Sequence, residues 1–229
     1  MRPFSQSIPV RVFAATSRLY FLNIRYVCLY PNGDRFSEKS SQIHMQNYSP
    51  LSAAGHRASW THVAAPHVSH VDLLWENEGW TANGVLGSDD AHFVIRMSAM
   101  WVVQQFLLFR DMDEPDLWLA TDGHGRWGEM NGDHRTELDG CIDIDLSGTP
   151  FTNSILIHRL PLHVGHSSTQ NVITVDTETL GVTVVPQMYT RLDTHRWQYI
   201  SLLQNKTVEV SVDEFGFVID EPGAFSRAN

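Results

Sequence analysis

Short apolar runs alternate with turn residues from Val68 to the end of the chain, at a spacing of about eight to twelve positions. This spacing is typical of a meandering antiparallel sheet in which tight turns join successive strands. Many strands in one chain need their edges covered, which favours strong curvature or closure. The pattern therefore predicts a mainly β fold, an antiparallel, strongly curved sheet or open barrel with few short helices.

Individual strands follow from apolar content and from alternation of apolar and polar residues. Strict alternation over residues 142–146 puts three apolar side chains on one face and Asp143 and Asp145 on the other, polar face. Residues 122–125 (DGHG) predict a hairpin turn with glycine where positive φ is needed. The expected strands are 93–97, 101–109, 117–120, 142–146, 155–160, 208–212 and 217–219, with 10–15 and 20–30 as weaker candidates.

Charge divides the chain into two parts near Pro66. Residues 1–66 carry seven Lys and Arg against two acidic residues, whereas the remainder carries nine against 24. Residues 37–59 are polar and show no sustained apolar period. We expect 1–66 to be an N-terminal extension, poorly ordered or loosely packed, and 67–229 to be the β domain. A chain beginning at Pro66 should then fold as well as the full chain.

The overall balance limits the partners and the compartment. The formal net charge of −10 argues against nucleic acid and anionic membranes as main partners. The most apolar N-terminal stretch, 19–30, is interrupted by Asn23 and Arg25 and is too short to span a bilayer. Cys28 and Cys141 form neither a disulfide framework nor a metal-binding spacing. We therefore expect a cytoplasmic protein with reduced thiols, no stable membrane insertion and no cofactor.

A series of motifs in the second part resembles one known family. The matching stretches, in chain order, are Asp122–Trp127 (DGHGRW), Leu138–Leu146 (LDGCIDIDL), Thr149–Asn153 (TPFTN), Ile157–Leu160 (IHRL), Gln187–Tyr189 (QMY), Val212–Asp213 and Pro222–Phe225 (PGAF). Together they resemble the putative glycolipid-binding family over residues 70–227. After Asn153 this chain has SILIHRL where the family usually has TLPIRRL, so one Pro and one Arg are replaced.

The resemblance implies a β-rich open barrel, similar in shape to bacterial carriers of lipid-modified proteins, that binds a ligand without catalysing a reaction. The ligand would be a lipid or glycolipid held in the concave cavity of the sheet. Candidate ligand-binding residues lie in the matching stretches; they are Trp127, Asp143, Asp145, Asn153, Arg159, Gln187 and Tyr189.

Arg159 has two plausible partners. In a strand over 155–160 it would share a face with Ile155 and Ile157, where an unpaired charge costs several kcal/mol if buried. A carboxylate from the acid-rich neighbouring strands would make it structural. The phosphate or sugar head of a ligand would make it a binding residue, because the guanidinium donates two parallel hydrogen bonds to either partner.

Two other classes of function remain open on the sequence. Asp139, Asp143 and Asp145 could serve a hydrolase, although residues two apart on one strand are poorly placed as an acid–base pair. The chain could also be a structural domain without a small ligand. The histidines at 158, 163 and 166 lack the further ligands that a zinc site needs, and Cys141 is expected to be a buried apolar residue, so we predict no metal.

Overall fold

The computed structural model of the protein describes residues 48–64, 67–87, 91–110 and 117–228. These ranges contain fourteen strands, one α-helix and a short 3-10 helix at Thr136–Leu138. In chain order the elements are β1 (His56–His62), β2 (Val68–Glu76), β3 (Gly79–Leu86), β4 (Ala91–Ser98), β5 (Val103–Phe109), β6 (Leu117–Thr121), β7 (Trp127–Glu129), β8 (Asp143–Leu146), α1 (Phe151–Arg159), β9 (Ser167–Val175), β10 (Val182–Arg191), β11 (Arg196–Ser201), β12 (Lys206–Val212), β13 (Val218–Glu221) and β14 (Phe225–Arg227).

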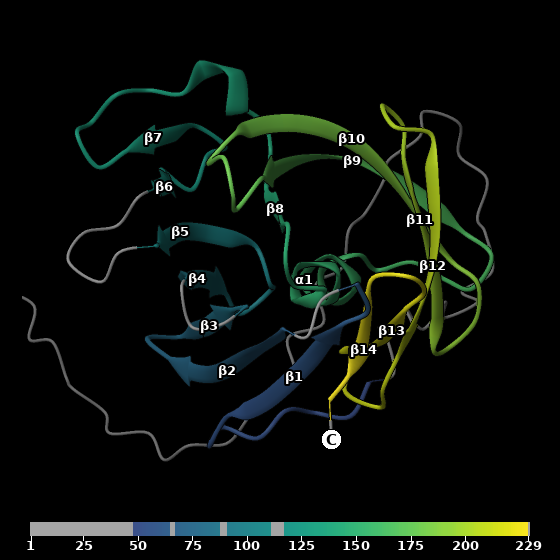
Figure 1. The fold of residues 1–229 in the computed structure, drawn as a ribbon. Coiled ribbons are helices and arrows are strands. Elements are labelled where there is room, and N and C mark those ends of the chain that lie inside the picture. The colour runs from purple at the N-terminus through teal and green to yellow at the C-terminus, as the bar shows by residue number, and fades with distance from the viewer. Residues whose placement is uncertain (1–47, 65–66, 88–90, 111–116, 229) are drawn as a thin grey trace, which may run out of the picture. The chain divides into compact units, whose positions relative to one another are not determined.

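All these strands belong to one sheet, in the order β7-β6-β5-β4-β3-β2-β1-β14-β13-β12-β11-β10-β9-β8. Neighbours are antiparallel except β8 and β9, which are parallel. The sheet curls around α1 (Figure 1), and β7 and β8 lie at its two ends without a ladder between them among the described residues. The mainly β fold with a strongly curved sheet is confirmed. The sheet is curled but not closed into a barrel.

The predicted domain boundary at residue 67 lies too late in the chain. Strand β1 pairs with β2 on one side and with β14 on the other, so it joins the first half of the sheet, β2–β7, to the second half, β8–β14. Trp60 on β1 is fully buried, and its Nε1 donates a hydrogen bond of 2.7 Å to the Val218 carbonyl. The segment 56–62 thus belongs to the β domain, which the polar composition around it concealed. The expected strands 10–15 and 20–30 lie outside the described residues.

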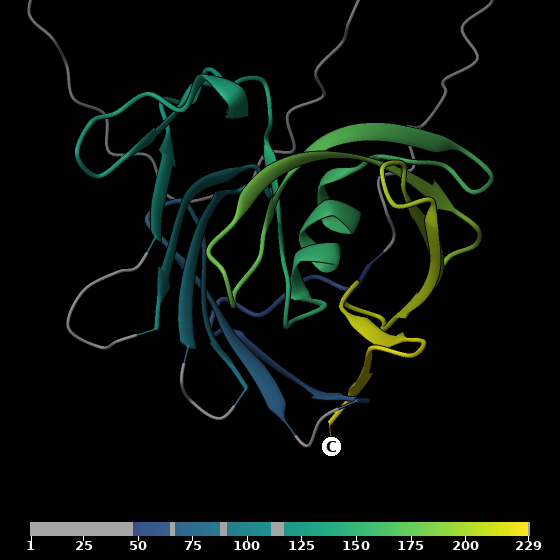
Figure 2. The same ribbon diagram turned by 45° about the horizontal axis from the view of Figure 1, so that its top comes forward.

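Helix α1 corrects the strand predicted over 155–160. Every residue from Phe151 to Ile157 is buried, because the helix lies between the two halves of the curled sheet (Figure 2). The Phe151 ring stacks between Phe93 of the first half and Phe217 of the second, at centroid distances of 6.4 and 6.1 Å. Three consecutive large apolar residues favour a strand locally, but burial on all sides makes the same run suitable for a helix. The concave face is therefore occupied at its centre and does not form an open cavity there.

Most of the other predicted strands are confirmed. Residues 93–97 lie in β4, 117–120 in β6, and 208–212 in β12, while the run 101–109 contributes β5 from Val103 onward. The DGHG hairpin joins β6 to β7, and Gly123 and Gly125 have φ of 79° and 85° as expected. In the part of the chain that the structure describes, no helix has the length and apolar character needed to cross a bilayer.

Candidate functional site

Polar side chains from β8, α1, β10, β11 and β13 meet where α1 faces the second half of the sheet. We call this group the polar cluster; its members are Asp145, Asn153, Gln187, Tyr189, Tyr199 and Glu221. Positions two apart on a strand share a face, which brings Gln187 and Tyr189 together, and the register sets Tyr199 opposite Tyr189. Four of the seven sequence-predicted residues are thus neighbours in space: Asp145, Asn153, Gln187 and Tyr189.

Hydrogen bonds run through the polar cluster from one carboxylate to the other. Gln187 Nε2 donates to Asp145 Oδ2 at 3.0 Å, and Tyr189 Oη donates to Asn153 Oδ1 at 2.7 Å. Asn153 Nδ2 then donates to Glu221 Oε2 at 3.2 Å. Buried polar groups are stable when they are paired in this way. The cluster therefore ties α1 to β8, β10 and β13.

Burial sets the protonation of the polar cluster. Desolvation raises the pKa of Glu221, and the neighbouring charge of Asp145 raises it further. Desolvation also raises the pKa of Tyr189 and of Tyr199 above the ordinary tyrosine value. Both phenols therefore remain protonated donors at neutral pH. Tyr199 Oη donates to Glu221 Oε1 at 2.9 Å, so this carboxyl group is held by two donors.

Arg159 has a carboxylate partner, the first of the two alternatives that its sequence position left open. Its Nε and Nη2 donate to the two oxygens of Asp143 at 2.6 and 2.5 Å, and Nη2 also reaches Gln170 Oε1 at 3.0 Å. Asp143 is fully buried, so the hydrogen bonds from Arg159, and not solvent, satisfy its carboxylate. Desolvation raises the pKa of Asp143, and the hydrogen bonds from Arg159 oppose that shift. This pair closes the end of α1 against β8 and β9.

Trp127 and Asp139 lie apart from the polar cluster. Trp127 packs in the core of the first half, and its Nε1 donates to the Cys141 carbonyl at 2.9 Å. Asp139 accepts from His134 Nε2 at 2.9 Å. Among the described residues, Asp139, Asp143 and Asp145 share no hydrogen-bond partner. The three aspartates of the hydrolase alternative therefore do not form one group.

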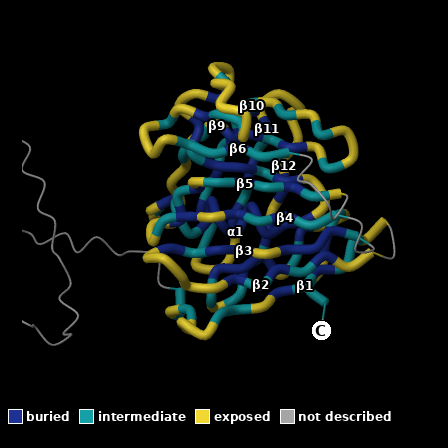
Figure 3. Tube along the Cα trace, turned by 90° about the vertical axis from the view of Figure 1, so that its left-hand side faces the viewer, coloured by how far each residue is buried: buried dark blue, intermediate teal, exposed yellow. Residues whose placement is uncertain are grey.

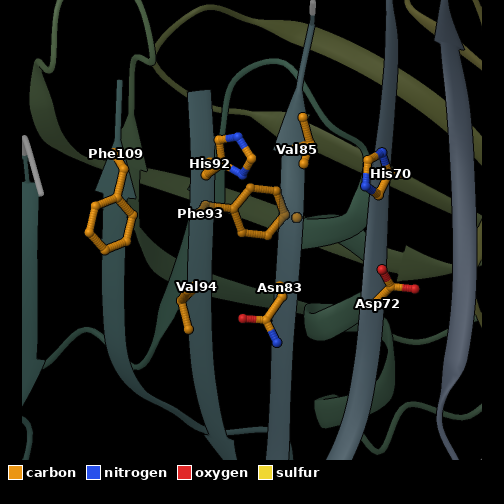
Figure 4. Close-up of a pocket in the computed structure, with 9 residues that line it drawn as sticks. His70, Asp72, Asn83, Val85, His92, Phe93, Val94 and Phe109 are labelled. Carbon is orange, nitrogen blue, oxygen red and sulfur yellow. The ribbon is translucent and has the colours of Figure 1, made fainter. Parts of the chain in front are cut away.

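The first half of the sheet carries a groove on its outer face, which the sequence did not predict. Phe93 packs inward against α1, so its neighbours on β4, His92 and Val94, point outward. The register aligns these positions with outward residues of β2, β3 and β5. The resulting outer groove has a volume of about 320 Å³ and is lined by His70, Asp72, Asn83, Val85, His92, Val94 and Phe109 (Figure 4).

The outer groove has an apolar floor and a polar rim. Val85 is only 9% exposed although it belongs to neither core cluster, and Val94 and Phe109 are half-buried beside it. Figure 3 shows this face of β1–β6, where buried and half-buried positions alternate along the strands. One sequence signal could have revealed the groove. Residues 106–109 (FLLF) are apolar on both faces of β5, whereas a strand with one solvated face should alternate.

His158 lies in an aromatic stack away from both sites. Its ring is 3.9 Å from that of Trp101 and nearly parallel to it, and its Nε2 is buried without a hydrogen-bond partner among the described residues. The His163 and His166 rings are 5.8 Å apart on an exposed turn. Within the described residues, no group of three or more His, Cys, Asp or Glu side chains could hold a metal ion.

The stability of the protein is expected to fall in mild acid because of His158. Burial lowers the pKa of His158 from 6.5 to about 3. In mild acid the His158 ring is therefore protonated in the unfolded chain but neutral in the folded protein. The free energy of unfolding should therefore decrease by about 1.4 kcal/mol per pH unit below pH ~6.5. Denaturant unfolding from pH 7 to pH 5 measures this slope. His158→Phe keeps an aromatic ring on Trp101 but should flatten the slope, whereas His124→Phe, at an exposed hairpin, should not. An unchanged slope in His158→Phe would contradict this account.

Comparisons with known proteins agree with the resemblance in the sequence. No curated protein matches the chain. The crystal structure of a DUF1089 family protein from Pseudomonas aeruginosa matches with a TM-score of 0.58 and 27% sequence identity, over 85% of this chain and 100% of that one. The family model described as "Putative glycolipid-binding" matches residues 57–227, a range that begins within β1 and ends within β14. The chain therefore belongs to this putative glycolipid-binding family.

Proposed function

We propose that the protein binds an amphiphilic, glycolipid-like ligand and leaves it chemically unchanged. The observation that carries this proposal is the outer groove, where an apolar floor lies beside hydrogen-bonding side chains. Ligand sites commonly combine an apolar lining with a few polar groups that fix orientation. The family description supports a glycolipid as the ligand class. Because α1 occupies the centre of the concave face, the outer face offers the better location for a hydrocarbon chain.

The polar cluster is better suited to a structural role than to holding the ligand. Its carboxyl, amide and phenol groups are bonded to one another, and five of its six members are no more than 9% exposed. A ligand would have to replace these bonds to enter. The head-group role expected for Asp145, Asn153, Gln187 and Tyr189 stays a prediction, as does the role expected for Trp127. The bonds within the polar cluster favour holding α1 in place.

A charge on the floor of the outer groove is expected to abolish ligand binding. In Val94→Glu a carboxylate would replace a half-buried apolar side chain. A bound hydrocarbon chain would remove water from this carboxylate without offering a hydrogen bond in return, so binding becomes unfavourable. Native mass spectrometry after incubation with a mixed extract of glycolipids and phospholipids should show a lipid adduct on the parent protein and none on Val94→Glu. Ile219→Glu introduces the same charge at a 39% exposed position of β13 and should keep the adduct. An adduct of equal intensity on Val94→Glu would place the ligand elsewhere.

A further inference from the structure

A second hollow adjoins the outer groove and has a different chemical character. It opens beside β3, β4, β5 and β6, with a volume of about 390 Å³. We call it the polar hollow; the lining residues that matter here are Glu76, Thr81, Arg96, Gln105 and Asp122. The register places Thr81, Arg96 and Gln105 side by side on three neighbouring strands, facing outward like the groove. The polar hollow is therefore a row of outward polar positions on the same face.

The polar hollow and the outer groove follow one another along the same strands. Arg96 and Val94 are successive outward positions on β4, as are Thr81 and Asn83 on β3. From Arg96 to His92 the strand covers about 13 Å, at roughly 3.3 Å per residue. A molecule lying along β4 would therefore meet polar groups at one end and an apolar floor at the other. This is the distribution of polarity within an amphiphile.

Three hydrogen-bonding side chains of the polar hollow, those of Glu76, Arg96 and Gln105, are free to bind a ligand, whereas Asp122 accepts hydrogen bonds from the backbone of its own turn. No hydrogen bond or ion pair joins the side chains of Glu76, Arg96 or Gln105 to another residue that the structure describes. The polar cluster under α1 is the opposite case, since its groups satisfy one another. Arg96 supplies a planar fork of donors, Gln105 both a donor and an acceptor, and Glu76 an acceptor. Together they match the mixed donors and acceptors of neighbouring hydroxyl groups.

The charges around the polar hollow favour a sugar over a phosphate. Glu76 and Asp122 set two carboxylates against the single guanidinium of Arg96. An anionic head would meet net repulsion here, and the formal net charge of the chain, −10, adds to it. An uncharged polyhydroxyl head can use all three side chains without that cost.

We propose that the polar hollow binds the sugar head of the ligand while the outer groove holds its hydrocarbon chain. The inference rests on the proposed function, which supplies the glycolipid-like ligand, and it adds the place where the sugar head binds and the orientation of the ligand along β4. Selectivity for a sugar head then comes from Arg96 and Gln105. Affinity for the hydrocarbon chain of the ligand comes from the apolar floor around Val94.

Two probes with the same hydrocarbon chain and different head groups test whether the polar hollow binds the head and the outer groove binds the hydrocarbon. Octyl β-glucoside and octyl phosphate, each below its micellar concentration, are titrated calorimetrically into the full chain. The parent protein is expected to bind the glucoside more tightly. Arg96→Ala/Gln105→Ala should weaken glucoside binding about tenfold or more, since each lost polar contact is worth about 1 kcal/mol. The binding of octyl phosphate, which rests mainly on its hydrocarbon chain, should change much less. Arg196→Ala/Gln198→Ala removes the same residue types from β11 and should bind both probes as the parent does.

The outcomes separate the inference from the proposed function. The inference is overturned if the parent binds both probes and the Arg96→Ala/Gln105→Ala variant keeps its affinity for both, or loses affinity for both equally. The polar hollow would then not distinguish one head group from the other. If the parent binds neither probe, the proposed function itself is overturned. Val94→Glu is a second control, because a charge on the floor of the outer groove should weaken the binding of both probes. Circular dichroism spectra that match the parent's show that each variant is folded.

Discussion

A chain that begins at Pro66 is expected to lose cooperative unfolding, although its composition suggests that nothing essential has been removed. The truncation deletes β1, and with it the ladders to β2 and β14 that connect the two halves of the sheet. It also removes Trp60, whose side chain is fully buried. Losing one large aromatic from a core costs about 3–5 kcal/mol, and a typical domain has only about 5–15 kcal/mol in total. Two new sheet edges would be exposed as well.

Calorimetry and near-ultraviolet circular dichroism measure this effect. The matched control begins at Tyr48 and keeps every residue that the structure describes. It should give one cooperative transition with near-ultraviolet signals from fixed aromatic side chains. The chain beginning at Pro66 should show a broad transition or be insoluble. A sharp transition at the temperature of the control would mean that β1 contributes little to the fold.

Local alternation was enough to predict the strands whose environment differs between their two faces. The run 208–212 alternates apolar and polar residues, and it lies in β12 with Val208, Val210 and Val212 buried. Hairpin chemistry was equally local, because only glycine adopts the positive φ at positions 123 and 125 without strain. Such signals depend on neighbours a few residues away. They are therefore readable without the tertiary fold.

Helix α1 and strand β1 could not be predicted from local sequence patterns. The run Ile155–Ile157 is compatible with a strand and with a helix buried on every side, and only its position inside the curled sheet decides between them. Strand β1 contains few apolar residues, and it becomes a central strand because β14, at the far end of the chain, pairs with it. In both cases the deciding contacts are long-range.

The sites show the same limit. Family motifs led to Asn153, Gln187 and Tyr189, which the structure brings together, but not to Glu221, which completes the hydrogen bonds from β13. The outer groove depends on the register of four strands, so no single segment identifies it. The apolar run in β5 is its one local signal, and by itself it predicts only a strand. Side chains from different strands become a site only when the register is known.

Arg159→Met is expected to destabilise the protein by about 3–5 kcal/mol, because it leaves the Asp143 carboxylate buried in the core without its ion-pair partner. The arginine side chain is 12% exposed and that of the aspartate 0%, so water cannot replace the lost hydrogen bonds. Since burial raises the pKa of Asp143 despite the partner, the charged pair itself contributes little net stability. Asp143→Val/Arg159→Met, which removes both charges, should therefore recover most of the loss. Denaturant unfolding of the parent, both single variants and the double variant measures the coupling between the two residues.

Two outcomes would separate this structural role from a part in ligand binding. Arg196→Met breaks exposed ion pairs on β11 and should leave the melting temperature nearly unchanged, so a large shift there would show that any arginine loss is costly. Octyl glucoside affinity should be unaltered in the Asp143→Val/Arg159→Met variant, because the outer groove and the polar hollow lie on the other face of the sheet. If this variant is stable but no longer binds the glucoside, Arg159 holds the ligand and the site must be sought beneath α1.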